Sequence, residues 1–533
     1  MVVAFVTRLF FAGQIVFPKP EDTAYYFGVA RNVLEGRGLV SDALWSYATP
    51  PLVFPRPAFE VWLPLPTLLA AIPMALFGHS FAAAQISSVV IGAVVPVLGW
   101  RLALDLAEER GLSVDRSRWL ALGTGLTSAV YLPLLLNSAL PDSTMPFAVI
   151  VLGACLLMNR LVRDPRGASA RDPRLIATGL LLGLGALTRN ETVWLAMIWV
   201  AMAWRAVPAS RQTRVRMIAV VAIVALVVFA PWAYRNVREF GSPLPGQAIT
   251  NALYLTGYDI FAWNDPPTLA RHLRLGLGGL IELRLIGLGH NLFNVLMLLG
   301  LPISVLGLVA LPWQGRGRTL RPLLAISLIM FAVTSLLFPA ATQWGTFLHA
   351  AGPIHVLVVI CGVAAIDASL ARLGRRMAWA RSVSWVGMTG SIAGSLLFSA
   401  ALLPSFGQGS RSTEALYREL GSRMAAAGHP LDASAGPVIS NFPIWMAETQ
   451  RIPSLALPDE PPLDVLDLAQ HFDGTHLLVL ISPEGTHWPA DLRANAPGSE
   501  CFRPIDLGPY RGPGTDPLSA TTVYDITCPE SSP

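Results

Sequence analysis

The 533-residue chain has few charged residues: Asp, Glu, Lys and Arg make up only 14% of it, whereas 53% of the residues are hydrophobic. Soluble domains carry roughly 25% charged residues, so this scarcity excludes an entirely soluble protein and predicts a multi-pass membrane protein. The net charge of +4 is carried by short clusters of Arg between apolar runs. Such clusters orient membrane proteins and are poor evidence for nucleic-acid binding.

Cysteine is scarce as well, and the four Cys form neither a CxxC pair nor a Cys/His metal spacing. The scattered His also lack ligand spacing, so we predict no protein-bound metal. The N-terminus has neither a basic n-region nor a small-residue cleavage site, so we expect no cleaved signal peptide.

The Arg-rich clusters predict a topology, because basic loops stay on the cytoplasmic side. They occupy residues 101–118, 160–174, 205–216, 316–321 and 372–381. The apolar runs between them then cross outward and return, at 119–136 with 143–160, 217–234 with 288–311, and 321–338 with 346–367. Further spans are expected at 81–106 and 382–403, and the second of these would export the C-terminal tail.

The first apolar runs are irregular. Residues 2–17 are short for a hydrocarbon core of ~30 Å, and they contain Arg8. Either Arg8 faces a protein interior, or the true start lies upstream. Residues 59–77 carry three Pro and are more typical of a helix lying along the membrane. The same topology puts the N-terminus in the cytoplasm and residues 18–80 outside, as the first external loop.

Residues 175–204 have basic clusters on both sides, so this run must go out and come back. Each half would be only ~20 Å long, too short for a full span. The apex, Thr188-Arg189-Asn190-Glu191, should then lie below the outer surface inside a protein cavity, where charged groups are paired or face the cavity.

The first external loop begins with EDTAYYFGVARNVLEGRGL, residues 21–39, an amphipathic helix that starts with two acids and ends at Gly36 and Gly38. Its apolar face can lie against the bilayer. The predicted topology places a set of charged residues on the outer face together with this helix. They are Glu21, Asp22, Asp142, Arg189, Glu191 and Arg235.

From residue 404 the chain is typical of a small soluble domain. Helix patterns at 412–427 and 462–472 and strand-like runs at 437–440, 476–482 and 521–526 indicate an α/β fold. Outside the cell Cys501 and Cys528 could pair, and a disulfide is favoured over two free thiols. We therefore predict an all-α polytopic transmembrane bundle of about eleven spans with juxtamembrane helices over residues 1–403, and an extracytoplasmic α/β domain over residues 404–533.

Several stretches over residues 1–400, in this order and on this side of the membrane, resemble the GT-C superfamily of polytopic glycosyltransferases. The resemblance is to the branch with the bacterial protein O-mannosyltransferases and the lipid A aminoarabinose transferase. The stretches are EDTAYYFGVARNVLEGRGL, LPDSTMPFAVIVL, GLLLGLGALTRNETVWL and PWAYRNVREFGSPL. Two departures stand out. The first loop lacks a DxD triplet, which disfavours a metal-dependent oligosaccharyltransferase, and Arg189-Asn190 replaces the Lys-Gly often found at the hairpin apex.

The resemblance implies inverting transfer of a sugar from a polyprenyl phosphate, without a cofactor, to a protein, lipid or polysaccharide acceptor. Such a transfer needs a base for the acceptor's hydroxyl proton. By motif position the base is Asp22, with Glu21 as second candidate. The alternative is that Asp22 only caps the helix after Pro20. Asp142 either orients the acceptor and helps the base, or caps the helix that follows it.

Arg189 could hold the lipid phosphate through its guanidinium, or form a structural salt bridge with Glu191, and both can be true. Arg235 could also hold phosphate, although an Arg at a helix end more often snorkels to the interface. For Arg56 and His349 a structural role is favoured over substrate binding. Tyr25 could stack on a sugar or belong to an aromatic belt.

The alternative function is a membrane transporter or a lipid flippase for cell-envelope precursors, since these proteins also use broken helices and buried charges. The sequence contains no visible internal repeat, and the large first loop with its acids favours an enzyme. A third possibility is an inactive homologue that acts as a scaffold in envelope assembly. The retained Glu21, Asp22 and Asp142 count against it.

Overall fold

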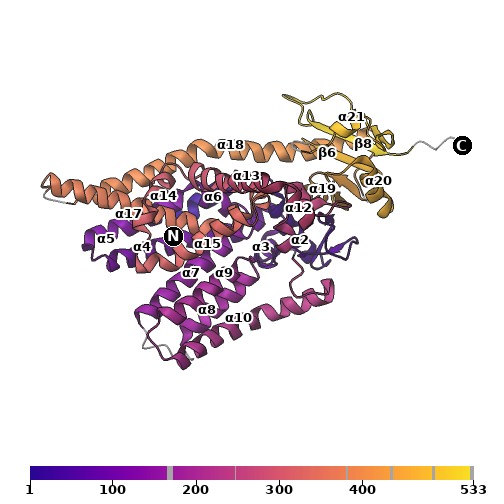
Figure 1. Ribbon diagram of the computed structural model, residues 1–533. Helices are drawn as coiled ribbons and strands as arrows, with labels where there is room; N and C mark the ends of the chain where they lie inside the picture. Colours follow the sequence, from indigo (N-terminus) through magenta and orange to yellow (C-terminus); the bar gives the residue numbers. More distant parts are fainter. Residues whose placement is uncertain (165–171, 247, 380–381, 433–435, 483–485, 529–533) are drawn as a thin grey trace.

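The computed structural model describes residues 1–164, 172–246, 248–379, 382–432, 436–482 and 486–528. Helices form a bundle that makes up most of the molecule, and a small mixed sheet lies at one end of it, near the C-terminus (Figure 1). Helix α18 (Ser384–Ala426) runs along the bundle and reaches the sheet (Figure 1).

Among the described residues, seven helical segments are long and apolar enough to cross a membrane, and the bent pair α5 (Val114–Val130) and α6 (Leu132–Ser138) makes an eighth if it is one span. Besides α18, the seven comprise α4 (Phe81–Glu109), α7 (Thr144–Arg163), α10 (Arg211–Phe240), α13 (Gly276–Gly289) with the π-helix that extends it to Leu298, α15 (Arg321–Leu336) with the turn before it, and α17 (Gly352–Arg376).

The expected number of about eleven spans differs from this result because several apolar runs fold as shorter helices. Two of these are α1 (Val2–Ala12) and α14 (Ile303–Gln314). The run expected at 288–311 is interrupted between Leu298 and Ile303, at a turn that contains Gly300 and Pro302. Proline lacks the N–H that would continue the helix.

Arg8 of α1 is fully buried and faces protein. Its Nε donates to Ser138 Oγ at 3.0 Å, and its Nη1 donates to the carbonyl oxygens of Ala4 and Ala129 at 3.1 and 3.2 Å. The polar groups of α5 and α6 therefore solvate this cation. Of the two alternatives for Arg8, the structure supports a place in the protein interior.

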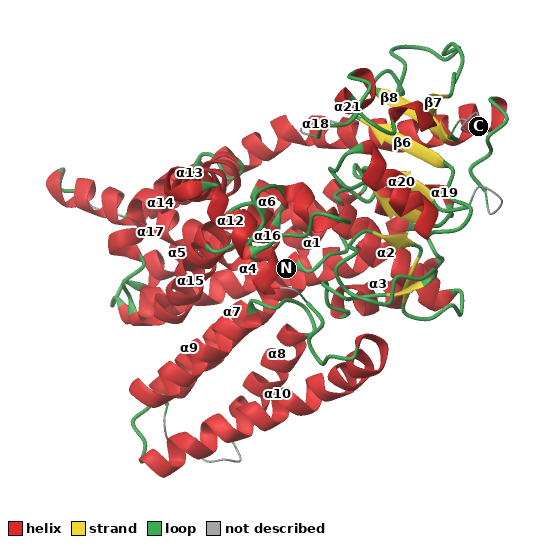
Figure 2. Cartoon of the chain, turned by 45° about the vertical axis from the view of Figure 1, so that its right-hand side comes forward, coloured by secondary structure: helices red, strands yellow, loops and turns green. Residues whose placement is uncertain are grey.

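The expected short hairpin consists of α8 (Pro173–Ala186) and α9 (Thr192–Arg205). At ~1.5 Å per residue each helix is about 21 Å long, shorter than the hydrocarbon core. Gly179 and Gly183 lie one turn apart on α8, and a Cβ on them would come within 2.7 and 2.6 Å of Val224 and Val228 on α10. The glycines thus let α8 and α10 pack closely side by side (Figure 2).

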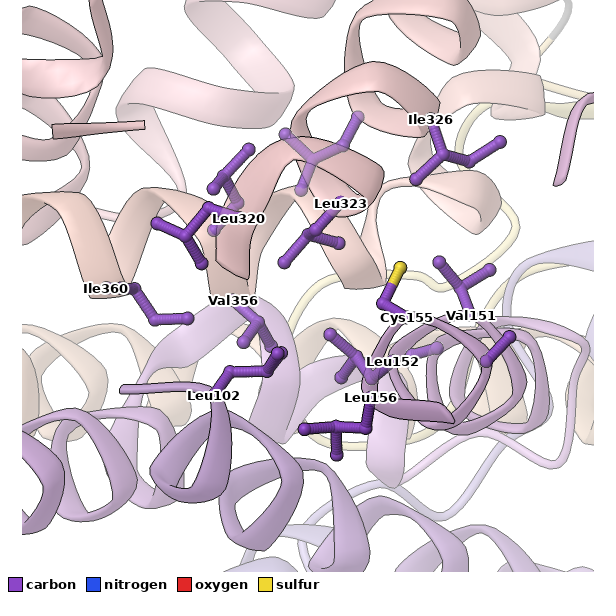
Figure 3. Packing of buried hydrophobic residues seen from close by; sticks show 14 of the residues in the cluster. Leu102, Val151, Leu152, Cys155, Leu156, Leu320, Leu323, Ile326, Val356 and Ile360 are labelled. Atoms are coloured by element: carbon purple, nitrogen blue, oxygen red, sulfur yellow. The ribbon is translucent and has the colours of Figure 1, made fainter. Parts of the chain in front are cut away.

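The core of the bundle forms where α4, α7, α15 and α17 meet. Figure 3 shows Leu102 of α4 next to Val356 of α17, with Leu323 of α15 and Leu152 of α7 facing the same space. All four side chains are fully buried. Lipid tails are as apolar as these side chains, so van der Waals packing holds the helices together inside a membrane.

The sheet unites two distant parts of the chain. Its strand order is β2-β5-β4-β6-β8-β7, and β2 (Ala43–Leu44), from the loop of residues 18–80, pairs parallel with β5 (Ser454–Ala456). The other strands are β4 (Val438–Ser440), β6 (Leu477–Ile481), β7 (Phe502–Pro504) and β8 (Thr521–Ile526). Helix α19 (Pro443–Gln450) follows β4, and α20 (Pro462–His471) follows β5, as parallel strands require.

The expected boundary between residues 403 and 404 falls inside α18, which joins the span expected at 382–403 and the helix expected at 412–427 into one helix. The two regions also share a hydrophobic core. Tyr25 and Trp45 of the first loop lie in the same buried cluster as Leu455 and Leu478 of the sheet. The C-terminal region is therefore packed directly on the loop of residues 18–80.

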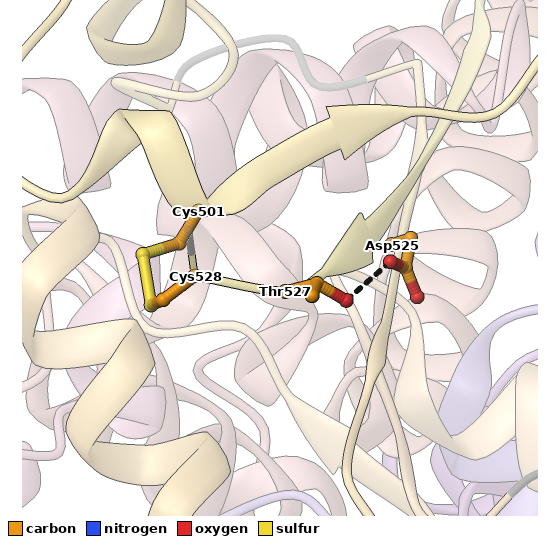
Figure 4. Close-up of a disulfide and its surroundings, with 4 residues drawn as sticks. All are labelled: Cys501, Asp525, Thr527 and Cys528. Atoms are coloured by element: carbon orange, nitrogen blue, oxygen red, sulfur yellow. Dashed lines mark hydrogen bonds between the residues drawn. A yellow bond between two sulfur atoms is a disulfide. The ribbon is translucent and has the colours of Figure 1, made fainter. Parts of the chain in front are cut away.

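A disulfide joins Cys501 to Cys528 (Figure 4), the pairing that the sequence favoured. It connects the segment before β7 to the end of the chain after β8. Cys155 and Cys361 are free and buried in the bundle.

The remaining elements are short and belong mostly to the loops. Strands β1 (Val40–Ser41) and β3 (Arg56–Pro57) pair antiparallel. The helices are α2 (Glu21–Leu34), α3 (Leu65–Phe77), α11 (Ala248–Asn251), α12 (Leu269–Arg274), α16 (Thr346–Ala350) and α21 (Ala490–Arg493).

Candidate active site

Asp22 lies in the first turn of α2 and faces His349 of α16. The distance from Asp22 Oδ2 to His349 Nε2 is 3.2 Å, and the Asp22 side chain keeps 24% of its exposure. The N-cap position of α2 is occupied by Pro20, so Asp22 lies within the helix and does not cap it. Its carboxylate is therefore held by another helix and is still open to solvent.

His349 connects Asp22 to Asp142. Its Nδ1 lies 3.3 Å from Asp142 Oδ2 and 3.1 Å from Thr144 Oγ1, and the imidazole is only 3% exposed. Burial alone would lower the pKa of His349, but the negative charges of Asp22 and Asp142 outweigh it, so the net effect is a raised pKa. The imidazolium form is thereby stabilised between two carboxylates.

Asp142 binds the start of α7 and also faces His349. Its Oδ1 accepts a hydrogen bond of 2.8 Å from the Thr144 backbone N–H at the start of α7, and its other oxygen faces His349. Within the described ranges, Asp142 Oδ2 and His349 Nε2 are buried without a hydrogen bond of good geometry. Buried polar atoms of this kind mark a place where a further polar group, from water or a substrate, can bind.

The apex of the hairpin places Arg189 against the same cluster. Arg189 Nη1 donates to Ser143 Oγ at 2.9 Å, next to Asp142, and Nη2 donates to the Thr346 carbonyl oxygen at 3.1 Å, in α16. Its Nε and Nη2 also donate to the Glu191 carboxylate, at 3.1 and 2.6 Å. Arg189 and Glu191 each keep 13% of their side-chain exposure. The expected salt bridge is present, and it lies beside the acids.

Two residues of the cluster did not figure among the sequence candidates. Tyr26 is buried between Asp22, Asp142 and Arg189 and faces Ser143, and burial raises the pKa of its phenol. Both residues carry a signal in the sequence, however. Tyr26 follows Asp22 by four positions and so shares its helix face, and Ser143 directly follows Asp142. Among the described residues, no group of three or more His, Cys, Asp or Glu could hold a metal ion.

Comparison with known proteins identifies solved structures with a similar fold. No family model matches the sequence, and neither does any curated protein. Solved structures do match: ArnT from Cupriavidus metallidurans bound to undecaprenyl phosphate has a TM-score of 0.54 at 13% identity, covering 100% of this chain and 98% of that one. The oligosaccharyltransferase AglB from Archaeoglobus fulgidus, with an inhibitory peptide and a dolichol-phosphate, has a TM-score of 0.54 at 14% identity, covering 94% of this chain and 72% of that one.

The chain shares its fold with ArnT and AglB, and the GT-C resemblance seen in the sequence is thereby confirmed at the level of the fold. Three of the stretches that carry the resemblance meet at the cluster. They provide Asp22 from the first turn of α2, Asp142 from the start of α7 and Arg189 from the α8–α9 apex.

Glu21, the second candidate for the base, points away from this cluster. Its Oε1 accepts hydrogen bonds from the backbone N–H groups of Ile444 and Trp445, at 2.9 and 3.3 Å, in the first turn of α19. Burial raises the pKa of Glu21 to about 8, against the opposing effect of the two N–H donors. The two neighbouring acids therefore face different helices, α19 and α16.

Tyr25 and Arg56 lie together in a second, fully buried network below α2. Tyr25 OH accepts from the Phe59 backbone N–H at 2.7 Å, and its ring packs against Trp62 with 4.4 Å between centroids. Arg56 lies 3.2 Å from Glu60 and donates to the carbonyl oxygens of Ser46 and Thr49 at 2.6 and 2.5 Å. These contacts stabilise the fold of the loop of residues 18–80, and the geometry favours the structural role for both residues.

Arg235 near the end of α10 is also engaged by the first loop. Its Nη1 donates to the Ala58 carbonyl oxygen at 2.7 Å, Nη2 donates to that of Leu39 at 3.3 Å, and the guanidinium lies 4.9 Å from the centre of the Trp232 ring. The hydrogen bonds of Arg235 thus hold α10 against the loop. Five of the candidates from the sequence come together in one cluster: Asp22, Asp142, Arg189, Glu191 and His349. The other four, Glu21, Tyr25, Arg56 and Arg235, have their partners outside it.

Proposed function

We propose that this chain transfers a sugar from a polyprenyl-phosphate donor to an acceptor hydroxyl at the outer face of the membrane. Support comes first from the GT-C fold, since one neighbour was solved with undecaprenyl phosphate and another with a dolichol-phosphate. The observation that carries the proposal is the cluster itself: an open carboxylate, two buried groups without full hydrogen bonding and a guanidinium, at the junction of α2, α7 and the α8–α9 apex.

Asp22 is the proposed general base. Of the three acids considered, it alone combines exposure with a contact inside the cluster: Asp142 is fully buried, and Glu21 faces α19. The acceptor oxygen bonds to the anomeric carbon as the bond from that carbon to the phosphate oxygen breaks. The acceptor's proton passes to the Asp22 carboxylate, and polyprenyl phosphate leaves. Attack opposite the leaving phosphate inverts the anomeric configuration.

His349 and Asp142 support this role by fixing the base. A histidine 3.2 Å from Asp22 limits the rotation of the carboxylate, and Asp142 fixes the imidazole from its other side, at 3.3 Å. This is the arrangement of a reacting group with a partner and an orienting third group. Asp142, itself held by the Thr144 N–H, has the rigidity that an orienting group needs.

Arg189 is the proposed contact for the donor phosphate. Its four hydrogen bonds use four of the five N–H groups of a guanidinium, so one N–H on Nη1 has no partner in the described part of the chain. Negative charge grows on the phosphate as the glycosidic bond breaks, and a fixed guanidinium stabilises it. Glu191 and the Thr346 carbonyl hold the group in place without covering that N–H.

The outer face is proposed from the positive-inside rule. The C-terminal sheet and the Asp22 cluster lie on the same side of the fold, because the loop that carries α2 contributes β2 to the sheet and α19 contacts α2. The Arg-rich clusters lie in the connections that are expected in the cytoplasm. The chain would thus be a multi-pass protein of the cell membrane, with its C-terminal region outside.

The test starts with lipids. Extracts from cells that lack the chain should contain an accumulated polyprenyl-phosphate sugar, detected by mass spectrometry against the wild type. Purified chain in detergent, mixed with that lipid and a cell-envelope extract as acceptor, should release free polyprenyl phosphate. A flippase needs two sides of a bilayer and releases nothing in detergent. If the accumulated lipid stays intact with wild-type protein, transfer is the wrong function.

A further inference from the structure

The first turn of α2 is held from both sides. Asp22 faces His349 in the bundle, and Glu21 accepts two backbone hydrogen bonds from Ile444 and Trp445 of α19. Successive residues of an α-helix point about 100° apart, so neighbouring side chains can reach different partners. The one-residue separation means that any shift of Glu21 relative to α19 moves Asp22 relative to His349.

Further contacts hold the same interface. Trp445 Nε1 donates to the Pro18 carbonyl oxygen at 2.9 Å, just before α2, and the Trp445 ring meets Phe17 edge-on with 5.8 Å between centroids. In the second half of α2, Arg31 forms a bidentate ion pair with Glu448 of α19, in which Arg31 Nη2 lies 2.8 Å from Glu448 Oε2. Glu448 is only 8% exposed there.

We infer that Glu21 is a positioning residue for the proposed base: through it, docking of the C-terminal region on α2 sets the place of Asp22. This inference rests on the proposed function. Glu21 does not contact the cluster, and its carboxylate accepts hydrogen bonds from the first turn of α19. Two N–H donors that would otherwise lack partners at a helix N-terminus are satisfied by one side-chain oxygen, which gives the contact its direction.

The contact needs an acceptor oxygen at position 21, whereas a base needs a carboxylate. This difference separates positioning from catalysis. Glu21→Gln keeps the carbonyl oxygen that Ile444 and Trp445 bind and loses the ability to take a proton. Glu21→Ala loses both. A displacement of ~1 Å at a reacting group can lower the rate about 100-fold, so Glu21→Ala should lower kcat by about 10- to 100-fold.

The experiment measures release of polyprenyl phosphate by full-length protein in detergent, with the lipid that accumulates in cells without the chain as donor. The expected result is a large loss of kcat in Glu21→Ala, little change in KM, and recovery to near wild type in Glu21→Gln. Arg451→Ala is the matched control, because Arg451 pairs with Glu35 at the edge of the same interface, where the Arg451 side chain is 46% exposed. An exposed pair of that kind contributes little.

Each other outcome has a meaning. Equal loss in Glu21→Ala and Glu21→Gln would show that the carboxylate itself matters and would overturn the inference. Full activity in both would overturn it as well. If Glu21→Ala does not fold, Glu21→Met keeps an unbranched side chain of similar length without the carboxyl oxygens that Ile444 and Trp445 bind, and unchanged kcat in this variant would contradict the inference. Absence of release by the wild type would instead defeat the proposed function.

Discussion

His349 of α16 and Asp22 of α2 lie 3.2 Å apart, although more than three hundred residues separate them in the sequence. The contact closes the cluster, because the other imidazole nitrogen already faces Asp142. In the sequence, only motif position favoured Asp22 over Glu21 as the base. In the structure, the contact with His349 distinguishes Asp22 from Glu21, which faces α19.

Asp22→Asn should abolish sugar transfer, with kcat reduced by about 100- to 10,000-fold, the range of a lost general base. Asn keeps the size of the side chain and an oxygen that can face His349, so folding and binding of undecaprenyl phosphate should change little. Release of polyprenyl phosphate and lipid binding are measured side by side. Asp42→Asn is the control, because Asp42 pairs with Arg37 on the same loop outside the cluster. Wild-type turnover by Asp22→Asn would remove Asp22 as the base.

His349 should make the stability of the protein depend on pH. Its pKa in the fold is raised above the usual value, with burial opposed and outweighed by Asp22 and Asp142. The group therefore stabilises the fold fully below its ordinary pKa, and this contribution is lost as the pH rises through the raised pKa. The difference in melting temperature between wild type and His349→Gln should thus be largest below about pH 6.5 and shrink as the pH rises above it.

The control for this pH series is His487→Gln, because His487 is exposed and lies in the C-terminal region. Its melting temperature should follow that of the wild type over the whole range. A constant difference between wild type and His349→Gln would mean that His349 stays neutral, and that the two acids do not hold an imidazolium.

The sequence predicted more of this site than of the span count. Asp22, Asp142 and Arg189 could be placed on one face because the Arg clusters set the direction of each crossing, and this argument needs no contact to be known. The contacts themselves depend on tertiary packing. That Glu21 faces α19 follows from the docking of residues 443–450, a region more than four hundred positions away, and no local pattern contains it.

The domain boundary and the number of spans also depend on tertiary packing, which the sequence pattern does not contain. Hydropathy measures how apolar a run is, and it does not report where a helix breaks or continues. The turn with Gly300 and Pro302 splits one expected span, whereas α18 continues past Pro404 into the C-terminal region. Strand β2 is only two residues long, and its place in the sheet depends on β5 as partner.

Arg189 offers a test of the phosphate contact that separates it from the salt bridge. Arg189→Gln should weaken binding of undecaprenyl phosphate by about 10-fold or more, as expected for a lost charge-assisted hydrogen bond. It should also destabilise the protein, because Glu191 loses its partner. The double variant Arg189→Gln/Glu191→Gln restores the charge balance. If it recovers the melting temperature and not the lipid binding, Arg189 holds phosphate; recovery of both would leave only the structural role.

Arg56→Met should destabilise the protein by about 3–5 kcal/mol, because it leaves Glu60 as an unpaired buried charge and the carbonyl groups of Ser46 and Thr49 without donors. Thermal unfolding in detergent measures the loss. Arg37→Ala, which breaks the partly exposed pair with Asp42, should cost no more than about 1 kcal/mol. Below the melting temperature, the Arg56→Met protein should bind undecaprenyl phosphate as tightly as the wild type, since Arg56 is fully enclosed by the first loop. Weakened lipid binding at unchanged stability would instead return Arg56 to the set of substrate-binding residues.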